Sequence, residues 1–381
     1  MAYMSKRIDV AVLGHGIVAH TLALLLAQER LKVAMVSGPA HPSAQPQGSD
    51  IRAYSLNPKA QALLADLRVW PEGDAVTPMR SMWVCDTQAQ AGSASASFTL
   101  SAQDAQAPAL AWMVDVPALE AKLEQAVAFQ PGIVQCQASE VTHAALTVVC
   151  EGKHSPTRAA KALPWDRRPY PQTAVAARLL AQKPHGGVAR QWFLGPDIVA
   201  LLPIGGEHGH GVALVWSCAH AQAPHLLAHT DELIRTLTHI TDHALGTLTL
   251  QGAPAAWPLE RSHASRWTAP GLALCGDAAH AMHPLAGQGL NVGLADAAEL
   301  ARVVHEREFW RELGDLKLLR RYERARQAEV GAMGWLTDGL FGLFGQTDSR
   351  VQALRNWGMS GVDRLGPLKH WLARKAMGQT A

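Results

Sequence analysis

The residues best placed to do chemistry lie between Gly271 and Leu294, where one acidic residue is followed by a glycine-rich segment. The apolar run Leu272–Leu274 stops at Gly276-Asp277, a pattern typical of a buried strand with a carboxylate at its end. Gly287-Gln288-Gly289 then opens a helical pattern, and glycines there let a ligand approach the backbone closely. This spacing predicts a ligand site between Asp277 and the first free N–H groups of the helix. The alternative is an ordinary strand–loop–helix connection with structural glycines and a capping Asp277.

Two elements must position these residues. One is the short strand that ends before Asp277. The other is a helix whose apolar face carries Leu290, Leu294, Ala297 and Ala301.

A second glycine pattern lies near the N-terminus, between two apolar runs. Asp9–Leu13 and Lys32–Val36 read as strands, and the residues between them have the spacing of a helix. The turn has the G-x-G-x-x-A form of the dinucleotide fingerprint. Gly14 makes the tight turn, Gly16 admits a pyrophosphate, and Ala19 sits where the helix packs on the strand. The pattern predicts a βαβ unit that binds a nucleotide cofactor.

The acid that usually completes this fingerprint is missing. It is expected about 20 residues further on, at the end of the second strand, where it binds the ribose hydroxyls. Ser37 stands there, followed by a polar loop over residues 39–50. A serine can bind a ribose, but without the strength of a charge-assisted hydrogen bond. We therefore expect the adenosine half of the cofactor to be held weakly.

Composition is that of an ordinary globular protein with two lobes. The chain has 381 residues, is 48% hydrophobic and carries a formal net charge of +2, which argues against wholesale binding to nucleic acid. Its 5 cysteines are scattered and form no C-x-x-C pair, and its 18 histidines lack metal-ligand spacing. This usage predicts a reduced, cytoplasmic protein without a metal site. No signal peptide and no membrane-spanning run are recognised.

The string GDAAHxxHPxAGQGLNxGLxD, residues 276–296, resembles the second flavin motif of the aromatic-ring hydroxylases. The likeness is to the ubiquinone-biosynthesis branch, and the para-hydroxybenzoate hydroxylase type is a more distant relative. The resemblance implies that Asp277 holds the ribityl chain of FAD and that Pro284 lies where the flavin meets oxygen. It implies that Leu290 and Asn291 offer backbone N–H groups to the pyrimidine edge of the flavin.

Two further segments resemble the same family. Arg52 begins an R-A-x-x-L segment, and relatives use this Arg close to the flavin; the alternative is a surface Arg in a loop. Glu151-Gly152 opens a match to the D-G-x-x-S-x-x-R motif, completed by Ser155 and Arg158, with Glu in place of Asp. In relatives this motif serves FAD and the reduced nicotinamide. A polar residue is usual at the position of Val116, where valine cannot contact a phosphate.

The expected fold class is α/β, with a Rossmann-type FAD lobe, an inserted mixed or antiparallel β-sheet lobe for the substrate, and C-terminal helices. Alternating runs within residues 82–100 and 173–216 predict the strands of that sheet, and residues 224–243 predict a helix after it. Asp115 is expected to cap a helix with Pro117 in its first turn. The boundaries we expect are 1–75, 112–165 and 265–330 for the FAD lobe, 76–111 and 166–264 for the substrate lobe, and 331–381 for the C-terminal helical region.

The C-terminal tail is basic and amphipathic. Between Arg350 and Lys375 the basic residues face a single acid, Asp363, and are interleaved with Trp357 and Trp371. One interpretation is a helix that rests on an anionic membrane surface, at the inner face of the membrane. The other is a helix that packs its apolar side on its own protein.

The function that the resemblance implies is FAD-dependent hydroxylation of an aromatic ring on a polyprenylated ubiquinone precursor. NADPH or NADH would reduce the flavin, and O2 would form a flavin C4a-hydroperoxide that the phenol attacks. His283 and Pro284 are then nearest to the reacting oxygen, and no metal is needed. Two alternatives stay open: hydroxylation of another aromatic metabolite, and a non-catalytic role in a biosynthetic complex. The second is favoured by the weakened cofactor positions Ser37, Val116 and Glu151.

Overall fold

The computed structural model describes residues 8–37, 51–87, 96–137, 143–281 and 289–345. Several expectations fall outside these ranges: the loop over residues 39–50, the tail beyond residue 345, and four predicted site residues of the glycine-rich motif. Those four are His283, Pro284, Gly287 and Gln288.

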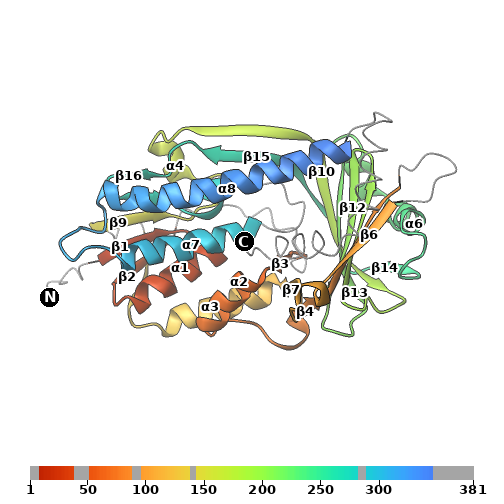
Figure 1. Cartoon of the computed structure of the whole chain (residues 1–381), viewed down its shortest axis with the longest axis horizontal. Helices are drawn as coiled ribbons and strands as arrows, with labels where there is room; N and C mark the ends of the chain where they lie inside the picture. Colours follow the sequence, from red (N-terminus) through yellow and green to blue (C-terminus); the bar gives the residue numbers. More distant parts are fainter. Residues whose placement is uncertain (1–7, 38–50, 88–95, 138–142, 282–288, 346–381) are drawn as a thin grey trace.

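Parallel strands form the centre of the first lobe (Figure 1). β1 (Ile8–Leu13) pairs with β2 (Val33–Ser37) on one side and with β9 (Ala144–Val149) on the other. The sheet order is β16-β17-β9-β1-β2-β8. Val10 and Val12 are fully buried, as expected for a parallel strand covered on both faces. Helix α1 (Ile17–Gln28) joins β1 to β2, so the predicted βαβ unit is confirmed.

The rest of this lobe comes from segments far apart in the sequence. Its other sheet strands are β8 (Ile133–Gln137), β16 (Thr268–Ala269) and β17 (Leu272–Leu274). Its helices are α3 (Val116–Phe129), α4 (Pro156–Ala160), α7 (Gly289–His305) and α8 (Leu316–Gly345), and the short 3-10 turn η4 (Gly276–Ala278) follows β17. One large core cluster joins α1, α3, α7 and the sheet.

A larger, mostly antiparallel sheet forms the second lobe, in the order β18-β15-β10-β13-β12-β11-β5-β6, with β14 also paired to β10. Its strands are β5 (Ser81–Asp86), β6 (Ala96–Ser101), β10 (Trp165–Ala181), β11 (Val188–Leu194), β12 (Asp197–Ile204), β13 (Gly211–Ala219), β14 (Leu248–Leu250), β15 (Ala255–Ala264) and β18 (His280–Ala281). The pairing of β11 with β5 is parallel, so the sheet is mixed. The expected fold class is therefore confirmed.

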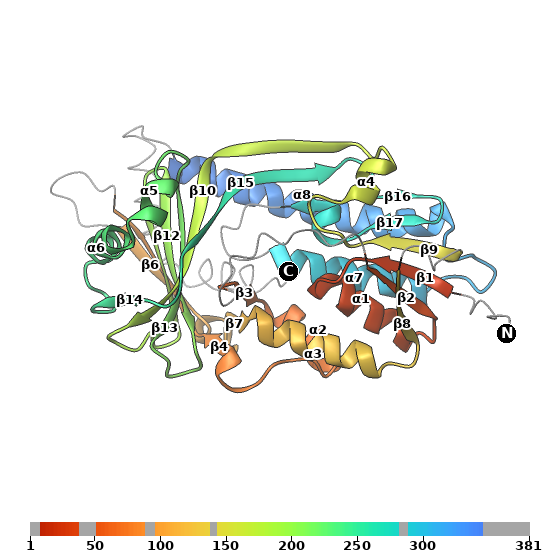
Figure 2. The same cartoon turned by 180° about the vertical axis from the view of Figure 1, so that it is seen from behind.

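A small sheet, β3-β7-β4, lies between the two lobes. Its strands are β3 (Ala53–Leu56), β4 (Val76–Met79) and β7 (Ala111–Asp115), accompanied by α2 (Pro58–Asp66) and the 3-10 turns η1 (Gly73–Ala75) and η2 (Gln103–Ala105). β4 and β7 also pack against β12 of the larger sheet. Figure 2 shows β10 and β15 running together from one lobe to the other, so the lobes share long strands.

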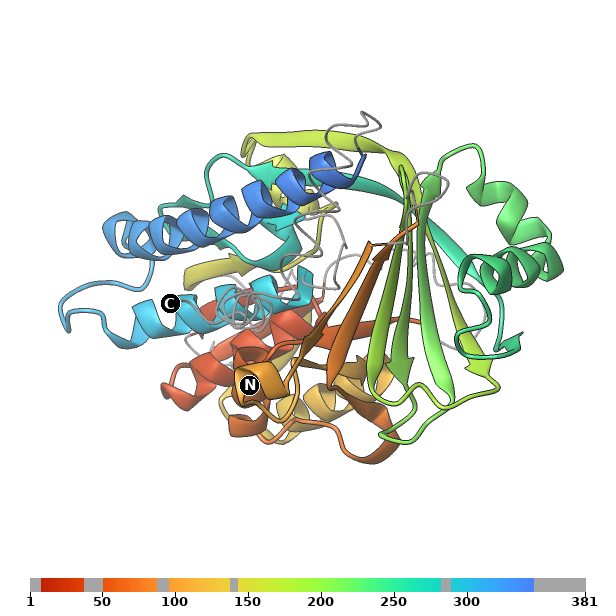
Figure 3. The ribbon, with the colours of Figure 1, turned by 45° about the vertical axis from the view of Figure 1, so that its right-hand side comes forward.

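One local expectation needs adjustment. The segment over residues 224–243 forms two helices, α5 (Ala223–Ala228) and α6 (Thr230–Ile240), because His229 has a non-helical backbone (φ −120°, ψ 71°). Both cover the outer face of the large sheet (Figure 3). Asp115 caps α3 as predicted, and strand β7 precedes it. Within the described residues, no helix is long and apolar enough to cross a membrane.

Candidate functional site

The carboxyl ends of four neighbouring strands bring the predicted cofactor segments to one edge of the first sheet. The turn after β1 contains Gly14, β2 ends at Ser37, Glu151 follows β9, and Gly276 follows β17. Backbone hydrogen bonds join the first turn to its neighbours: the Gly14 N–H donates to the Val36 carbonyl over 3.4 Å. Ligands of open parallel sheets bind at such an edge.

The two glycines of the first turn are required for different reasons. Gly14 has φ +125°, and a Cβ there would lie 2.4 Å from the Cys150 carbonyl oxygen, so the protein itself demands glycine. Gly16, the N-cap of α1, has an ordinary extended backbone (φ −79°, ψ 175°), and an added Cβ would meet no described protein atom within 4 Å. Neither the backbone conformation nor the packing at position 16 requires glycine. We infer that glycine is present there because it lets a ligand approach the N-terminus of α1 closely.

Ala19 and Val116 do not reach this edge with their side chains. Ala19 is fully buried in the core, in keeping with a packing position. Val116 is 1% exposed and packs in the same core, so it offers nothing to a phosphate. Ser37 is the last residue of β2 and is paired with Gln137 of β8, which is the strand-end position expected for the ribose contact.

Asp277 is presented outward by a tight turn. Its neighbours Gly276 and Ala278 are buried, whereas Asp277 is exposed, and Gly276 adopts φ +63°. Although its carboxyl is open to solvent, desolvation by the surrounding protein raises its pKa; the nearby Asp296 also raises it, and His280 and Lys153 lower it. An exposed carboxylate at this edge of the sheet is suited to accept hydrogen bonds from a ligand.

Helix α7 begins at Gly289, where an added Cβ would meet no described protein atom within 4 Å. Asn291 in its first turn is 7% exposed, and its amide is used within the protein. Its Nδ2 donates to the Ser55 carbonyl over 2.7 Å, and its Oδ1 accepts from the Asn57 N–H over 2.8 Å. The side chain therefore pins the β3–α2 segment to α7. Its backbone contact with a flavin, like that of Leu290, stays a prediction.

Arg52 lies where β3 meets the helix α3. Its side chain is half-buried and lies 3.4 Å from the carboxylate of Glu120, while its carbonyl accepts from the Arg178 guanidinium over 3.1 Å. Arg178 comes from β10 of the large sheet and also pairs with Asp115 at 2.7 Å. These contacts join the two lobes beside the small sheet. The structure thus places Arg52 at the junction of the lobes, and its contact with the cofactor remains a prediction.

Glu151 has a structural use that its spacing alone did not predict. Its carboxylate accepts from the Ser155 hydroxyl at 2.5 Å and from both the N–H and the hydroxyl of Thr157, at 3.0 and 2.8 Å. The extra methylene of Glu lets the side chain reach the first turn of α4. Gly152 has φ +76°, which favours glycine. Both residues were predicted to bind cofactor, and that prediction is left untested by these contacts.

Arg158 ties this turn to the Asp277 turn. It is 5% exposed, donates to the Ala278 carbonyl over 2.9 Å and to the Lys153 carbonyl over 2.6 Å, and lies over the Trp165 ring at 3.5 Å. Its burial lowers the pKa of the guanidinium, an effect that Glu151 partly offsets. The motif's arginine therefore acts here as a clamp between two loops of the sheet edge.

Sequence reasoning missed three buried residues behind the Asp277 turn, His280, Asp296 and Arg326. Asp296 closes the quoted motif, so its presence in that string was the available signal. Arg326 belongs to none of the quoted motifs. In the part of the chain that the structure describes, no group of three or more His, Cys, Asp or Glu side chains is arranged to hold a metal.

The face of the large sheet that is turned to the first lobe is lined by small apolar residues. Arg178 marks this face because it contacts Asp115 and Arg52. Strand register puts Ala176, Val215 and Ala200 side by side on it, in a row that Gln191 continues, and all four are partly exposed. The opposite face is packed by α5 and α6.

The chain is similar to known proteins along almost its whole length. A family model described as FAD binding domain matches residues 7–334. Ubiquinone hydroxylase UbiL of Rhodospirillum rubrum is 30% identical, over 98% of this chain and 90% of its own length. The 3-demethoxyubiquinol 3-hydroxylase of Escherichia coli is 28% identical, over 97% of this chain and 98% of its own. Among solved structures, PqsL of Pseudomonas aeruginosa, titled a probable FAD-dependent monooxygenase, has the same fold (TM-score 0.71, 20% identity, 94% of this chain and 100% of that one).

Proposed function

Because the chain belongs to the FAD-binding-domain family of flavin-dependent monooxygenases, we propose that it hydroxylates the aromatic ring of a polyprenylated ubiquinone precursor. The observation that carries this substrate class is the similarity, along almost the whole chain, to two ubiquinone hydroxylases. A phenol with an isoprenoid tail is the substrate class we infer. The ring position is left open.

The described residues at the sheet edge fit FAD. Gly16 and Gly289 leave open the N-termini of α1 and α7, where N–H groups suit a pyrophosphate and the polar edge of a flavin. Asp277 offers an accessible carboxylate to ribityl hydroxyls. When bound and reduced by a nicotinamide nucleotide, FAD would activate O2, which is the source of the oxygen atom that enters the ring.

The chain's own contribution is to bind, orient and exclude water. Arg178, by its contacts with Asp115 and the Arg52 carbonyl, holds the large sheet against the FAD lobe beside β3 and β7. The predicted roles of His283 and Pro284 close to the reacting oxygen belong to residues outside the described ranges and stay part of this proposal.

The row of small side chains on the inner sheet face is the surface we assign to the apolar substrate. Ala176, Ala200 and Val215 are partly exposed although they lie on central strands of the sheet. Small side chains leave room above the sheet, and their apolar character suits an aromatic ring or an isoprenoid tail. Gln191, on the same face and partly exposed, provides a polar group that can orient a phenol.

The direct test of the proposed function uses FAD-reconstituted protein, NADPH or NADH, and a short-tailed prenylated phenol under labelled O2. We expect one labelled oxygen atom in the product and substrate-stimulated oxidation of the nicotinamide. Protein that binds FAD but oxidises nicotinamide without labelling any prenylated phenol would refute the substrate class. Labelling of an untailed aromatic metabolite alone would favour the alternative hydroxylase.

A matched pair of substitutions tests the substrate surface. Ala200→Phe adds bulk in the middle of the inner face and should raise the KM for the prenylated phenol about tenfold or more, since a blocked apolar contact costs over 1 kcal/mol. Ala228→Phe adds the same bulk at an exposed position of α5, on the opposite side of the sheet, and should leave KM unchanged. FAD affinity should be equal in both. Equal KM values would remove the inner face from the substrate site.

The tail beyond residue 345 lies outside the described residues, and we propose that its basic, Trp-bearing segment docks on an anionic membrane surface, where a prenylated substrate would reside. Deleting Arg350–Ala381 should abolish sedimentation with anionic vesicles at low salt while leaving FAD binding intact. Full-length protein that ignores such vesicles would favour packing of the tail on its own protein. We also propose that the protein belongs to a biosynthetic complex. Copurification of other proteins of that complex from cells is the measurement that tests this.

A further inference from the structure

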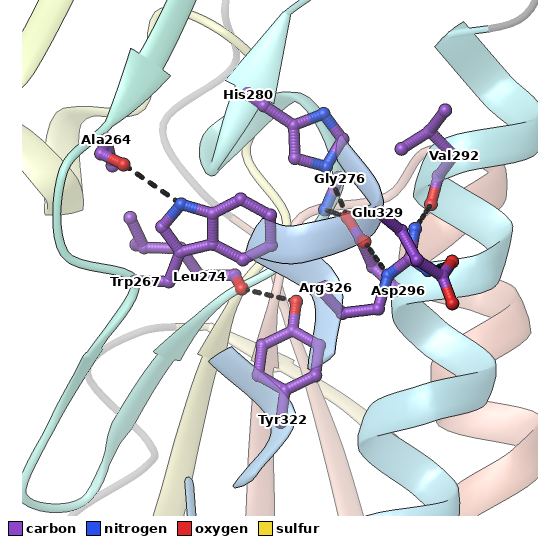
Figure 4. A network of polar contacts seen from close by, with 10 residues as sticks. All are labelled: Ala264, Trp267, Leu274, Gly276, His280, Val292, Asp296, Tyr322, Arg326 and Glu329. Carbon is purple, nitrogen blue, oxygen red and sulfur yellow. Dashed lines mark hydrogen bonds and ion pairs between the residues drawn. The ribbon is translucent and has the colours of Figure 1, made fainter. Parts of the chain in front are cut away.

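A buried polar cluster lies behind the Asp277 turn. It consists of Asp296 on α7, His280 on β18 and Arg326 on α8 (Figure 4). These side chains are 0%, 2% and 4% exposed. Burying charged groups costs several kcal/mol unless they are paired and hydrogen-bonded, so such a cluster needs a reason.

One carboxylate oxygen holds both ends of the turn. Asp296 Oδ2 accepts from the Gly276 N–H over 3.1 Å, and the same atom lies 2.6 Å from His280 Nε2. Gly276 directly precedes Asp277, and His280 follows it at the end of the turn. The His280 ring also stacks on Trp267, with ring centroids 5.1 Å apart. The two ends of the turn are thus fixed from behind, while Asp277 between them faces outward.

The second oxygen of Asp296 is held by the C-terminal helix. Arg326 Nε donates to Asp296 Oδ1 over 2.7 Å, and its Nη2 donates to the Val292 carbonyl over 3.3 Å. Arg326 also pairs with Glu329 on its own helix. Burial by itself would raise the pKa of Asp296, but His280 and Arg326 lower it below its ordinary value, through both charge and hydrogen bonds. The carboxylate is therefore charged at neutral pH.

The geometry points to Asp296 as a positioning residue for Asp277: it sets the turn through Gly276 and His280, and Arg326 makes that setting depend on α8. This inference rests on the proposed role of Asp277 as a flavin contact. A hydrophobic pair in the same place would stabilise the fold as well or better, so stability alone does not call for an ion pair here. The turn itself offers no side chain at Gly276 by which packing could orient it.

Glu323 provides a matched control on the same helix. It is also buried, and its carboxylate accepts from the Trp267 N–H over 2.7 Å and from the Thr268 hydroxyl over 2.8 Å. It supports the strands before the motif and makes none of the bonds that close the Asp277 turn. Glu323→Gln therefore removes a buried charge of the same kind without releasing the turn.

The experiment measures the Kd of FAD by titrating the quenching of flavin fluorescence with apoprotein, at a temperature where each variant is folded. Asp296→Asn should raise this Kd about tenfold or more, as expected for losing the hydrogen bonds of a charged acceptor. Glu323→Gln should lower the Tm of the apoprotein about as much as Asp296→Asn does. It should change the Kd of FAD less than about twofold. Since FAD binding requires no substrate, the result is independent of the proposed hydroxylation.

A double-mutant cycle with Asp277→Asn separates positioning from general weakening. If Asp296 acts through Asp277, the double variant binds FAD no more weakly than Asp277→Asn alone. Fully additive effects, or an unchanged Kd in Asp296→Asn while Asp277→Asn binds weakly, would overturn the inference and leave the role of Asp277 intact. An unchanged Kd in Asp277→Asn would overturn that role and the inference with it.

If Asp296→Asn does not fold, His280→Phe serves as the second variant. Phenylalanine keeps the ring that stacks on Trp267 and leaves the Asp296–Arg326 pair in place, but it removes one of the two bonds that close the turn. We expect a smaller rise in the Kd of FAD that is again absent in the Asp277→Asn background. A rise of equal size in both backgrounds would contradict the positioning role.

Discussion

Replacing Asp277 by Asn should have opposite effects on flavin binding and on apoprotein stability. The substitution keeps the shape of the side chain and removes its charge. In the folded apoprotein, desolvation raises the pKa of the Asp277 carboxyl above its ordinary value of 3.8. A carboxyl whose folded pKa is raised binds its proton more tightly in the folded state. Its ionised form therefore costs stability at neutral pH, and Asn removes that cost.

The magnitude for binding follows from the hydrogen bond that the carboxylate would accept. A hydrogen bond to a charged group contributes about 1.5–3 kcal/mol, which corresponds to about a ten- to hundredfold change in Kd. We expect Asp277→Asn to weaken FAD by that factor while the Tm of the apoprotein at pH 7 is equal or higher. Since FAD favours the ionised form, parent protein should also bind FAD less well as pH falls through the raised pKa of Asp277, and the variant should not show this dependence.

The assay is a flavin-fluorescence titration of apoprotein at several pH values, with Tm measured on the same samples. Asp66→Asn, at an exposed position on α2, is the control and should change neither quantity. Equal FAD affinity in parent and Asp277→Asn, or the same pH dependence in both, would show that Asp277 does not contact the flavin. A large loss of apoprotein stability would contradict the reading of its raised pKa.

Four other substitutions test the remaining cofactor segments. Gly16→Ala should weaken FAD binding about tenfold or more without lowering the Tm of the apoprotein. Gly14→Ala should instead destabilise the apoprotein by more than about 1 kcal/mol, because its Cβ would lie 2.4 Å from the Cys150 carbonyl oxygen. The reverse pattern would contradict both assignments. Glu151→Ala should lower the free energy of unfolding in urea by about 1–2 kcal/mol through loss of the α4 contacts, and an unchanged value would mean that they contribute nothing. Ser37→Glu should tighten FAD by about 1.5–3 kcal/mol in fluorescence titrations, and equal affinities would mean that Ser37 does not face the ribose.

The sequence by itself determined the elements and the family. The apolar runs at residues 9–13 and 272–274 became the buried strands β1 and β17, because parallel strands covered on both faces require apolar residues throughout. The need for glycine at position 14 could be predicted because its turn requires a positive φ. Asp115 was recognisable as a cap since capping uses only local hydrogen bonds. Such signals depend on neighbours within a few residues, which is the range that a linear pattern records.

Only the tertiary structure decided how the side chains of the motifs are used. Glu151 looked like a ligand contact, yet its oxygens are engaged by α4, and the side-chain amide of Asn291 is engaged by the β3–α2 segment. Asp296 was quoted only as the last residue of the motif, and it forms a buried ion pair with Arg326 at the back of the Asp277 turn. The physical reason is that a charge or an amide is hydrogen-bonded by whichever donors the fold brings within about 3 Å, and the partners of Asp296 and Asn291 lie tens to hundreds of residues away along the chain.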